Sequence, residues 1–284
     1  MKKIFNLTNI WATAGFALIF LFASCMEKPI EIPDLSVGKR RVLVEEATGV
    51  RCAACPDGAK TLTSLQGTLA AEGRELIVVS MHAAGPFSVP YTGNPANLYD
   101  FRSPDAQALA TYIGALEGFP SSAINRRLLP NETSTYVNPH TRWEGVIRSE
   151  LAKDYGFDIF IANDFNPATR QLNINVDILP DQTITGENRL TVLITQDSIK
   201  DLQNEHDVFK PNYLHRHVLR DMVTNVEGDV ITEVLATGTV IRKSFSVILP
   251  ANWNEKHCSV VAFVHHGGNP DKEVLQAAEQ HVVD

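Results

Sequence analysis

Two cysteines separated by two residues, Cys52 and Cys55, are the side chains in this sequence best suited to chemistry. The residues after them carry apolar side chains at helical spacing, so the sequence predicts a helix that starts at the cysteines and ends near Gly73. A cysteine at a helix N-terminus lies near unpaired backbone N–H groups and the positive end of the helix dipole, which favour the thiolate. We therefore predict that Cys52 is the attacking and more exposed sulfur, and that Cys55 resolves the mixed disulfide.

The elements around the cysteines form a predicted strand–helix–strand unit. An apolar strand at residues 41–44 runs into Glu45 and Glu46 before the cysteines, and a second buried strand covers residues 76–79 after the helix. A CxxC pair is weak information on its own. Its position between a buried strand and a helix makes a redox site a more specific prediction.

The rest of the chain divides into a helical part and a β-rich part. Two further helices are predicted, one capped by Ser103 and one that begins near Asn138. From Phe157 onward apolar and polar residues alternate, as in half-buried antiparallel strands, and turn residues separate the runs. We predict an α/β domain at residues 40–155 and an all-β sandwich domain of immunoglobulin-like type at residues 156–284.

The beginning of the chain has the order of a secretory signal peptide. Two lysines precede an apolar run and the small residues Ala23 and Ser24, after which Cys25 follows. This order resembles the lipobox of bacterial lipoproteins, which implies removal of residues 1–24 and a lipid on Cys25. An ordinary signal peptide with an incidental cysteine is the alternative. Residues 25–39 are then a tether, and no later segment is apolar for long enough to span a membrane.

The charge of the chain limits its partners. The net charge is −8, and loss of the signal peptide with Lys2 and Lys3, two positive charges, takes it to −10. An acidic surface disfavours nucleic-acid phosphates and anionic lipid head groups. We therefore expect no nucleic-acid partner, and contact with the membrane through the N-terminal lipid only.

The four cysteines can be assigned by counting. If Cys25 carries lipid, three remain, and in an oxidising compartment Cys52 and Cys55 are the natural disulfide. Cys258 opens an apolar, strand-like run, so we expect it to be a buried and unreactive thiol.

The predicted α/β domain resembles the thioredoxin superfamily in its Cys52–Cys55 motif and in the segment Gly118-Phe119-Pro120. The resemblance implies that Pro120 is a cis-proline that packs beside the cysteines. It also implies that the backbone of Phe119 is exposed to pair with a bound peptide strand.

The residues around the motif carry the resemblance further and also depart from it. The buried acid of thioredoxins corresponds by count to Glu46, although the strand phase also admits Glu45. Arg51 stands where thioredoxins have tryptophan; its charge could lower the pKa of the neighbouring thiol, or it could be solvated. About 35 residues separate His82 from Gly118, which implies an insertion near the site.

Histidines supply further candidates. His82 follows the second strand and could stabilise a thiolate at Cys52 or accept a proton, but a surface histidine that caps a loop fits the sequence equally well. The remaining candidates match no metal-ligand spacing, so we predict no metal site and no cofactor. These are His206, His215, His217, His265 and His266.

Over nearly its whole length the chain resembles the 28-kDa outer membrane protein family of bacterial lipoproteins. The segments that carry the resemblance are residues 42–56, 80–83, 217–220 and 273–278. It implies a thioredoxin-like domain followed by a β-rich domain, and an outer-membrane location with a lipid anchor. Whether the protein faces the periplasm or the cell surface stays open.

Two functions are consistent with the sequence. In the first, the protein is a thiol–disulfide oxidoreductase that exchanges disulfides with exported proteins or peptides through Cys52 and Cys55. In the second, it is a binding protein of the outer-membrane surface, an adhesin or receptor, in which the same disulfide is structural.

Overall fold

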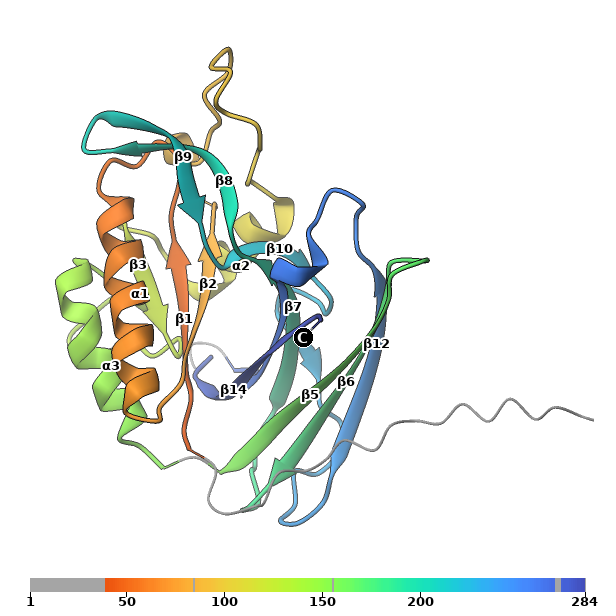
Figure 1. The fold of residues 1–284 in the computed structure, drawn as a ribbon. Helices are drawn as coiled ribbons and strands as arrows, with labels where there is room; N and C mark the ends of the chain where they lie inside the picture. The colour runs from red at the N-terminus through yellow and green to blue at the C-terminus, as the bar shows by residue number, and fades with distance from the viewer. Residues whose placement is uncertain (1–38, 84, 155, 269–271, 284) are drawn as a thin grey trace, which may run out of the picture. The chain divides into compact units, whose positions relative to one another are not determined.

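The computed structural model describes residues 39–83, 85–154, 156–268 and 272–283 (Figure 1). The predicted signal peptide, Cys25 and the predicted tether up to residue 38 lie outside the described residues. The described residues belong to one compact unit that spans Asp34–Asp284. Among them, no helix has the length and apolar character needed to cross a membrane.

The first strands and the first helix form the predicted strand–helix–strand unit. β1 (Val42–Ala47) and β2 (Leu76–Met81) are parallel neighbours, and α1 (Cys55–Ala71) connects them. Pro56 lies in the first turn of α1, where its missing N–H has no helical partner to lose. The helix ends before Gly73, whose φ of +66° suits glycine.

Helices cover both faces of this part of the sheet. α1 and α3 (Trp143–Leu151) pack on the face that carries Val42, whereas α2 (Pro104–Ile113) packs on the face that carries Leu43. Alternate residues of a strand point to opposite faces, so neighbours in β1 belong to different cores. Helices therefore cover both sides of the sheet, and α1 begins at one end of it.

Short elements complete this half of the chain. β3 (Ser121–Ile124) pairs antiparallel with β1, and β4 (Tyr136–Val137) pairs antiparallel with β3. Ser103 caps α2 as predicted, because its hydroxyl accepts a hydrogen bond from the backbone N–H of Ala106 at 3.0 Å. Single turns of 3-10 helix lie at Gly85–Phe87, His140–Arg142 and Glu255–His257.

Strands make up nearly all the regular structure after residue 156, and their pairing is mostly antiparallel. They are β5 (Phe157–Asn166), β6 (Gln171–Pro180), β7 (Asn188–Gln196), β8 (Ile199–Glu205), β9 (Val208–His215), β10 (Val218–Met222), β11 (Asp229–Val230), β12 (Ile241–Ile248), β13 (Cys258–His266) and β14 (Val274–His281).

The largest sheet joins strands from both halves of the chain. Its order is β14-β13-β7-β10-β2-β1-β3-β4, and β11 pairs with β7. The halves meet where β10 runs parallel to β2, with Val218 opposite Ser80. There the backbone N–H of Ser80 donates to the carbonyl oxygen of His217 at 2.7 Å. The sequence predicts a domain boundary near residue 155, yet strands from both sides of that residue are hydrogen-bonded in one sheet.

A second layer covers one end of this sheet. The three-stranded antiparallel sheet β12-β6-β5 packs on β7, β13 and β14 through a common apolar core. The alternating apolar residues that the sequence predicts to be buried all lie in it. They are Leu172, Ile174, Val176 and Ile178. The fold is therefore β-rich, with one mixed and further antiparallel sheets.

A separate hairpin, β8–β9, was not predicted from the sequence. Its turn consists of His206 and Asp207, with φ values of 49° and 62°, the backbone conformation of a tight two-residue hairpin turn. The hairpin lies over the end of β1 where α1 begins (Figure 1). It is therefore part of the surroundings of the cysteine pair.

Candidate functional site

Cys52 and Cys55 form a disulfide at the start of α1, with their Cα atoms 5.4 Å apart. Cys55 is the first residue of the helix, and Cys52 lies in the turn before it. That turn is closed by the N–H of Cys52, which donates to the carbonyl oxygen of Gly49 at 3.0 Å. The pairing and the position at the helix N-terminus agree with the sequence analysis. Cys258 is buried and free.

The exposure of the two sulfur-bearing residues differs from the prediction. Cys52 is 3% exposed and Cys55 is 2% exposed, so both are buried, whereas the motif alone predicts an exposed Cys52. The cause is β8, which lies along the loop before the helix. The backbone N–H groups of Asn204 and His206 donate to the carbonyl oxygens of Val50 and Ala53, at 2.8 and 3.0 Å.

Gln203 strengthens this cover with its side chain. It is buried, and its amide nitrogen lies 3.2 Å from the carbonyl oxygen of Gly49 and 3.1 Å from that of Cys52. Outside, Lys60 of α1 lies 2.5 Å from the carboxylate of Glu205. The hairpin is thus tied to the disulfide loop by backbone and side-chain hydrogen bonds.

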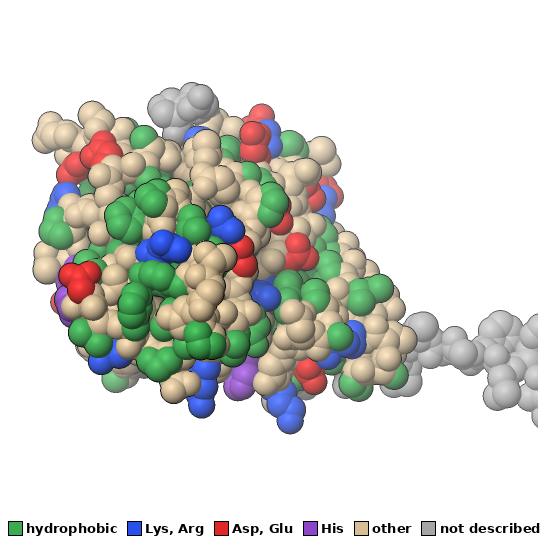
Figure 2. Space-filling model, turned by 90° about the horizontal axis from the view of Figure 1, so that it is seen from above, with side chains coloured by type: hydrophobic (Ala, Val, Ile, Leu, Met, Phe, Trp, Pro, Cys, Tyr) green, Lys and Arg blue, Asp and Glu red, His purple; other side chains and the backbone are tan. Residues whose placement is uncertain are grey.

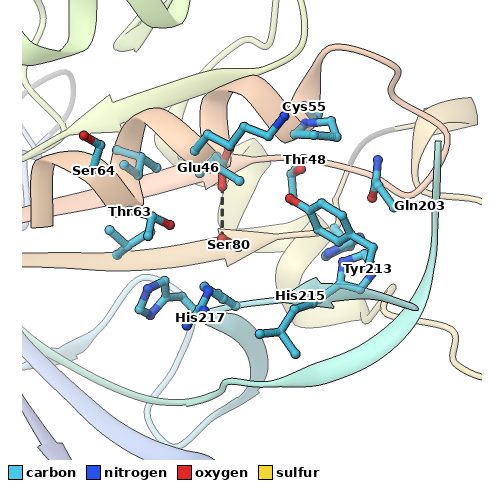
Figure 3. A pocket seen from close by; sticks show the side chains of 18 residues that line it. Glu46, Thr48, Cys55, Thr63, Ser64, Ser80, Gln203, Tyr213, His215 and His217 are labelled. Atoms are coloured by element: carbon cyan, nitrogen blue, oxygen red, sulfur yellow. Dashed lines mark hydrogen bonds between the residues drawn. The ribbon is translucent and has the colours of Figure 1, made fainter. Parts of the chain in front are cut away.

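The side chains of Glu45 and Glu46, near the end of β1, have different surroundings. Both oxygens of Glu45 accept hydrogen bonds from Arg126, each at 2.7 Å, in a fully buried ion pair. Glu46 is also buried, and one oxygen, Oε2, accepts a hydrogen bond from the hydroxyl of Ser80 at 3.0 Å (Figure 3). Burial raises the pKa of Glu46 to about 7, and the hydrogen bond from Ser80 offsets part of that rise. Of the two acids, Glu46 shares a pocket with Cys55.

Pro120 lies against the first turns of α1. The peptide bond between Phe119 and Pro120 is cis, as is the bond between Asn138 and Pro139. A β-carbon added at Gly58 would be only 3.0 Å from the ring of Pro120, so the proline packs on the helix one turn after the cysteines. The contact is with Gly58, three residues after Cys55.

His82 is not a surface residue that caps a loop. It is 3% exposed, and its ring packs beside those of Phe101 and His215, with centroid separations of 4.8 and 5.6 Å. Burial, together with the nearby His215, holds the pKa of His82 well below its usual value. The ring is therefore neutral near neutral pH.

Arg51 holds the insertion that the sequence analysis predicts after His82. Its guanidinium donates to the carbonyl oxygens of Val89 and Pro90, both at 2.6 Å, and lies over the ring of Tyr91. The residue is half-buried, and its side chain is held by these contacts. Its contacts fix the segment after β2 beside the disulfide loop.

Hydrophobic side chains gather on the face seen from the hairpin end of the molecule (Figure 2). The hairpin contributes Val208 and Phe209, both more than half exposed, and the insertion contributes Phe87. The ring of Phe209 meets that of Tyr91 at 4.9 Å, edge to face. This contact joins the hairpin to the insertion.

A pocket of about 430 Å³ lies beside the disulfide (Figure 3). Its walls are α1, the strands β1 and β2, Gln203 of β8, the end of β9 and the two residues after β9. Cys55 lines the pocket, whereas Cys52 does not. The pocket therefore reaches the disulfide at its Cys55 end.

Residues that line this pocket carry buried polar atoms without a hydrogen-bond partner in the described part of the chain. They are Oε1 of Glu46, Nδ1 of His82, Nε2 of His215 and Nδ1 of His217. The pKa of His215 is lowered to about 4 by burial, which the carboxylate of Asp201 and a hydrogen bond to the backbone of Leu202 partly oppose.

The sequence analysis weighed His215 and His217 only as metal ligands. Among residues 39–83, 85–154, 156–268 and 272–283, no cluster of His, Cys, Asp and Glu could hold a metal ion. Both histidines instead line the pocket, together with Tyr213 (Figure 3). No spacing in the sequence indicates this, because the hairpin brings them to Cys55 from about 160 residues away.

The fold and the site define a β-rich protein of mixed and antiparallel sheets with a buried disulfide at a helix start. The family model of outer membrane protein Omp28 matches residues 106–284. That match covers more than half of the chain, so the protein belongs to the Omp28 family and is an outer membrane protein. The family resemblance predicted from the sequence is confirmed. The matched residues begin after the cysteine pair.

A solved structure with a similar fold is that of HBP35 of Porphyromonas gingivalis. The two structures align with a TM-score of 0.68 over 87% of this chain and 76% of the other, at 16% sequence identity. At this identity the similarity concerns the fold alone. No curated protein sequence matches the chain.

Proposed function

We propose that this protein is a lipid-anchored, thioredoxin-like outer membrane protein that exchanges disulfides through Cys52 and Cys55. The observation that carries the proposal is the disulfide at the N-terminus of α1, with the buried carboxyl group of Glu46 in the same pocket as Cys55. A helix N-terminus stabilises a thiolate, and a thiolate is the species that exchanges.

The surrounding fold supports the thioredoxin-like part of the proposal. β1 and β2 are parallel strands joined by α1, and β3 runs antiparallel to β1 on its other side. Pro120 packs on α1 close to the cysteines. The lipid anchor rests on the sequence around Cys25.

The proposed reaction needs a proton acceptor near the disulfide. Exchange proceeds by thiolate attack on one sulfur, formation of a mixed disulfide, and resolution by the second cysteine. With its pKa raised to about 7, Glu46 can hold or release a proton near neutral pH. We assign to Glu46 the transfer of a proton to and from Cys55, with exported proteins or peptides as the exchange partners.

A second function is favoured by one observation, the cover over the disulfide. Both cysteines are buried under a hairpin held by hydrogen bonds to the loop at residues 49–53. A structural disulfide would be expected in such a place. The protein would then act as an adhesin or receptor of the outer-membrane surface, and the disulfide would only fix the start of α1.

Paired substitutions separate the two functions. The variant Cys52→Ser with Cys55→Ser is compared with Cys258→Ser, which removes the buried free thiol and keeps the disulfide. We expect the double variant to lose exchange with a reduced secreted protein while its unfolding stays cooperative, and Cys258→Ser to keep exchange. The binding function would be supported instead by two results together. The wild-type protein would show no exchange, and the wild type and the double variant would bind cell surfaces equally.

A further inference from the structure

The two sulfurs of the disulfide have different surroundings. The loop that carries Cys52 is covered by β8, whose backbone and Gln203 side chain donate hydrogen bonds to the carbonyl oxygens of Gly49, Val50, Cys52 and Ala53. A thiol on another protein could reach Cys52 only after these bonds had broken. In this structure β8 therefore blocks the approach of another protein to Cys52.

Cys55 has an open space beside it. The pocket of about 430 Å³ that it lines falls in the size range of small-molecule sites, and it has no room for a folded polypeptide. Ala59, one turn after Cys55 on α1, lines the same pocket. A small molecule can therefore approach the disulfide at Cys55 while the hairpin stays in place.

The polar atoms of the pocket indicate the kind of molecule that fits. Buried polar groups in folded proteins are nearly always hydrogen-bonded, yet Glu46 Oε1, His82 Nδ1 and His215 Nε2 have no partner in the described residues. In His215 the hydrogen bond to the backbone of Leu202 must come from Nδ1, since Nε2 has no partner. The neutral ring therefore presents Nε2 as an acceptor, which suits a ligand with an N–H or O–H group.

The charges among the lining residues indicate an acidic ligand. Lys60 is paired with Glu205, but Arg216 is exposed and makes no hydrogen bond or ion pair within the described chain. A free guanidinium at a pocket matches a carboxylate, which it can bind with two parallel hydrogen bonds. The ligand that fits thus carries a carboxylate and a hydrogen-bond donor, and it is far smaller than a protein.

We propose that a small thiol that carries a carboxylate reduces this disulfide by entering the pocket and attacking Cys55. The inference rests on the proposed exchange function and adds its reductant and the sulfur that is attacked. Exported proteins remain the partners of the reduced form.

The reaction is balanced as two exchanges. The first thiol forms a bond between its sulfur and Cys55 Sγ, the bond between Cys52 and Cys55 breaks, and the thiol's proton ends on Cys52. A second thiol attacks the sulfur of the first, a small-molecule disulfide leaves, and its proton ends on Cys55. Two small thiols are oxidised to one disulfide, and the protein disulfide is reduced to two thiols.

The position of the mixed disulfide tests the proposal directly. Full-length mature protein is mixed with N-acetylcysteine, quenched with acid within its first turnover, alkylated and digested for mass spectrometry. We expect the N-acetylcysteine adduct on Cys55 and the alkyl label on Cys52. An adduct on Cys52 instead would overturn the proposal and leave the exchange function intact.

Two substitutions on the same helix test the route. Ala59→Phe fills the pocket next to Cys55, and Ala70→Phe adds the same side chain to an exposed position of α1 away from the pocket. We expect Ala59→Phe to slow reduction by N-acetylcysteine about tenfold, and Ala70→Phe to leave the rate unchanged. Equal rates for the two variants, both shown to be folded by circular dichroism, would contradict the route.

The charge of the thiol provides a last comparison. N-acetylcysteine and N-acetylcysteine amide differ only in the carboxylate. Arg216→Gln should slow the acid by about twofold to fivefold and leave the amide unaffected, the size expected for one exposed ion pair. If Arg216→Gln affects both thiols equally, the carboxylate is not recognised and this part of the proposal is wrong. A wild-type disulfide that no thiol reduces would instead remove the exchange function itself, and this inference with it.

Discussion

At the scale of single residues, Glu45 and Glu46 show why neighbouring acids have different roles. Glu45 is neutralised by Arg126 on one face of β1, whereas Glu46 points to the other face, where the hydroxyl of Ser80 donates to it. The sequence places a buried acid before the cysteines, but it leaves the choice between the two open, because both positions fit the strand. Which of the two acids is neutralised depends on which one meets Arg126. The sequence does not show this, because Arg126 lies 81 residues away from Glu45.

The raised pKa of Glu46 predicts a pH-dependent stability. In the folded protein the carboxyl group titrates at about 7 instead of 4.5, so the folded state holds its proton more tightly. Its contribution to stability is fully present below pH 4.5 and is lost as the pH rises through about 7. Glutamine does not ionise, so we expect Glu46→Gln to remove this loss. As the pH rises from 4 to 8, the free energy of unfolding of the variant should increase by about 3 kcal/mol relative to that of wild type.

Urea unfolding of both oxidised proteins across this pH range measures the difference. Ser80 can still donate to the amide oxygen in Glu46→Gln, so its hydrogen bond is not lost. A difference in the free energy of unfolding that does not change with pH would show that Glu46 is ionised in the folded protein at its ordinary pKa.

At the scale of elements, the β8–β9 hairpin changes the interpretation of the cysteine pair. The helix start and the disulfide follow from local sequence, since the CxxC spacing and Pro56 are both within one turn of it. The cover over Cys52 does not follow, because part of it consists of hydrogen bonds between backbone groups, which every residue except proline can form, and because Gln203 and Asn204 are about 150 residues away from the loop. The side-chain pattern therefore predicts a reactive site, and the tertiary structure decides which of the two cysteines lines a pocket.

The hydrogen bonds of Gln203 predict how firmly the hairpin is held. Gln203→Ala removes the donor to the carbonyl oxygens of Gly49 and Cys52. Because each bond contributes about 1 kcal/mol, we expect the amides of Asn204 and His206 to exchange with deuterium about tenfold faster. Hydrogen-exchange mass spectrometry checks this, with Gln171→Ala at an exposed strand position as the control. Unchanged exchange of these amides would show that the backbone bonds alone hold the hairpin.

At the scale of the whole molecule, the chain builds one large sheet from residues that the sequence assigns to two domains. The alternation of apolar residues after Phe157 predicts strands and their buried faces, and most of these strands are present. It cannot predict which strand lies next to which, so the parallel contact of β10 with β2 is absent from the sequence analysis. One apolar core accordingly contains Ile77 of the first half together with Leu219 and Phe263 of the second.

This shared core predicts cooperative unfolding. Because the halves share a sheet and an apolar core, the described unit should unfold by urea in a single transition that fluorescence and circular dichroism report at the same midpoint. Two separated transitions would instead support independent domains on either side of residue 155. The tryptophans help here, since Trp143 lies in one half and Trp253 in the other.

The central claim, that Cys52 and Cys55 exchange, is tested most directly by the reduction potential of their disulfide. Full-length mature protein is equilibrated with mixtures of reduced and oxidised glutathione, quenched with acid and alkylated, and the reduced fraction is counted by mass. We predict a potential between about −180 and −280 mV, the range of proteins that exchange disulfides. A value below about −300 mV would contradict the account, because such a disulfide resists reduction and serves as a structural bond.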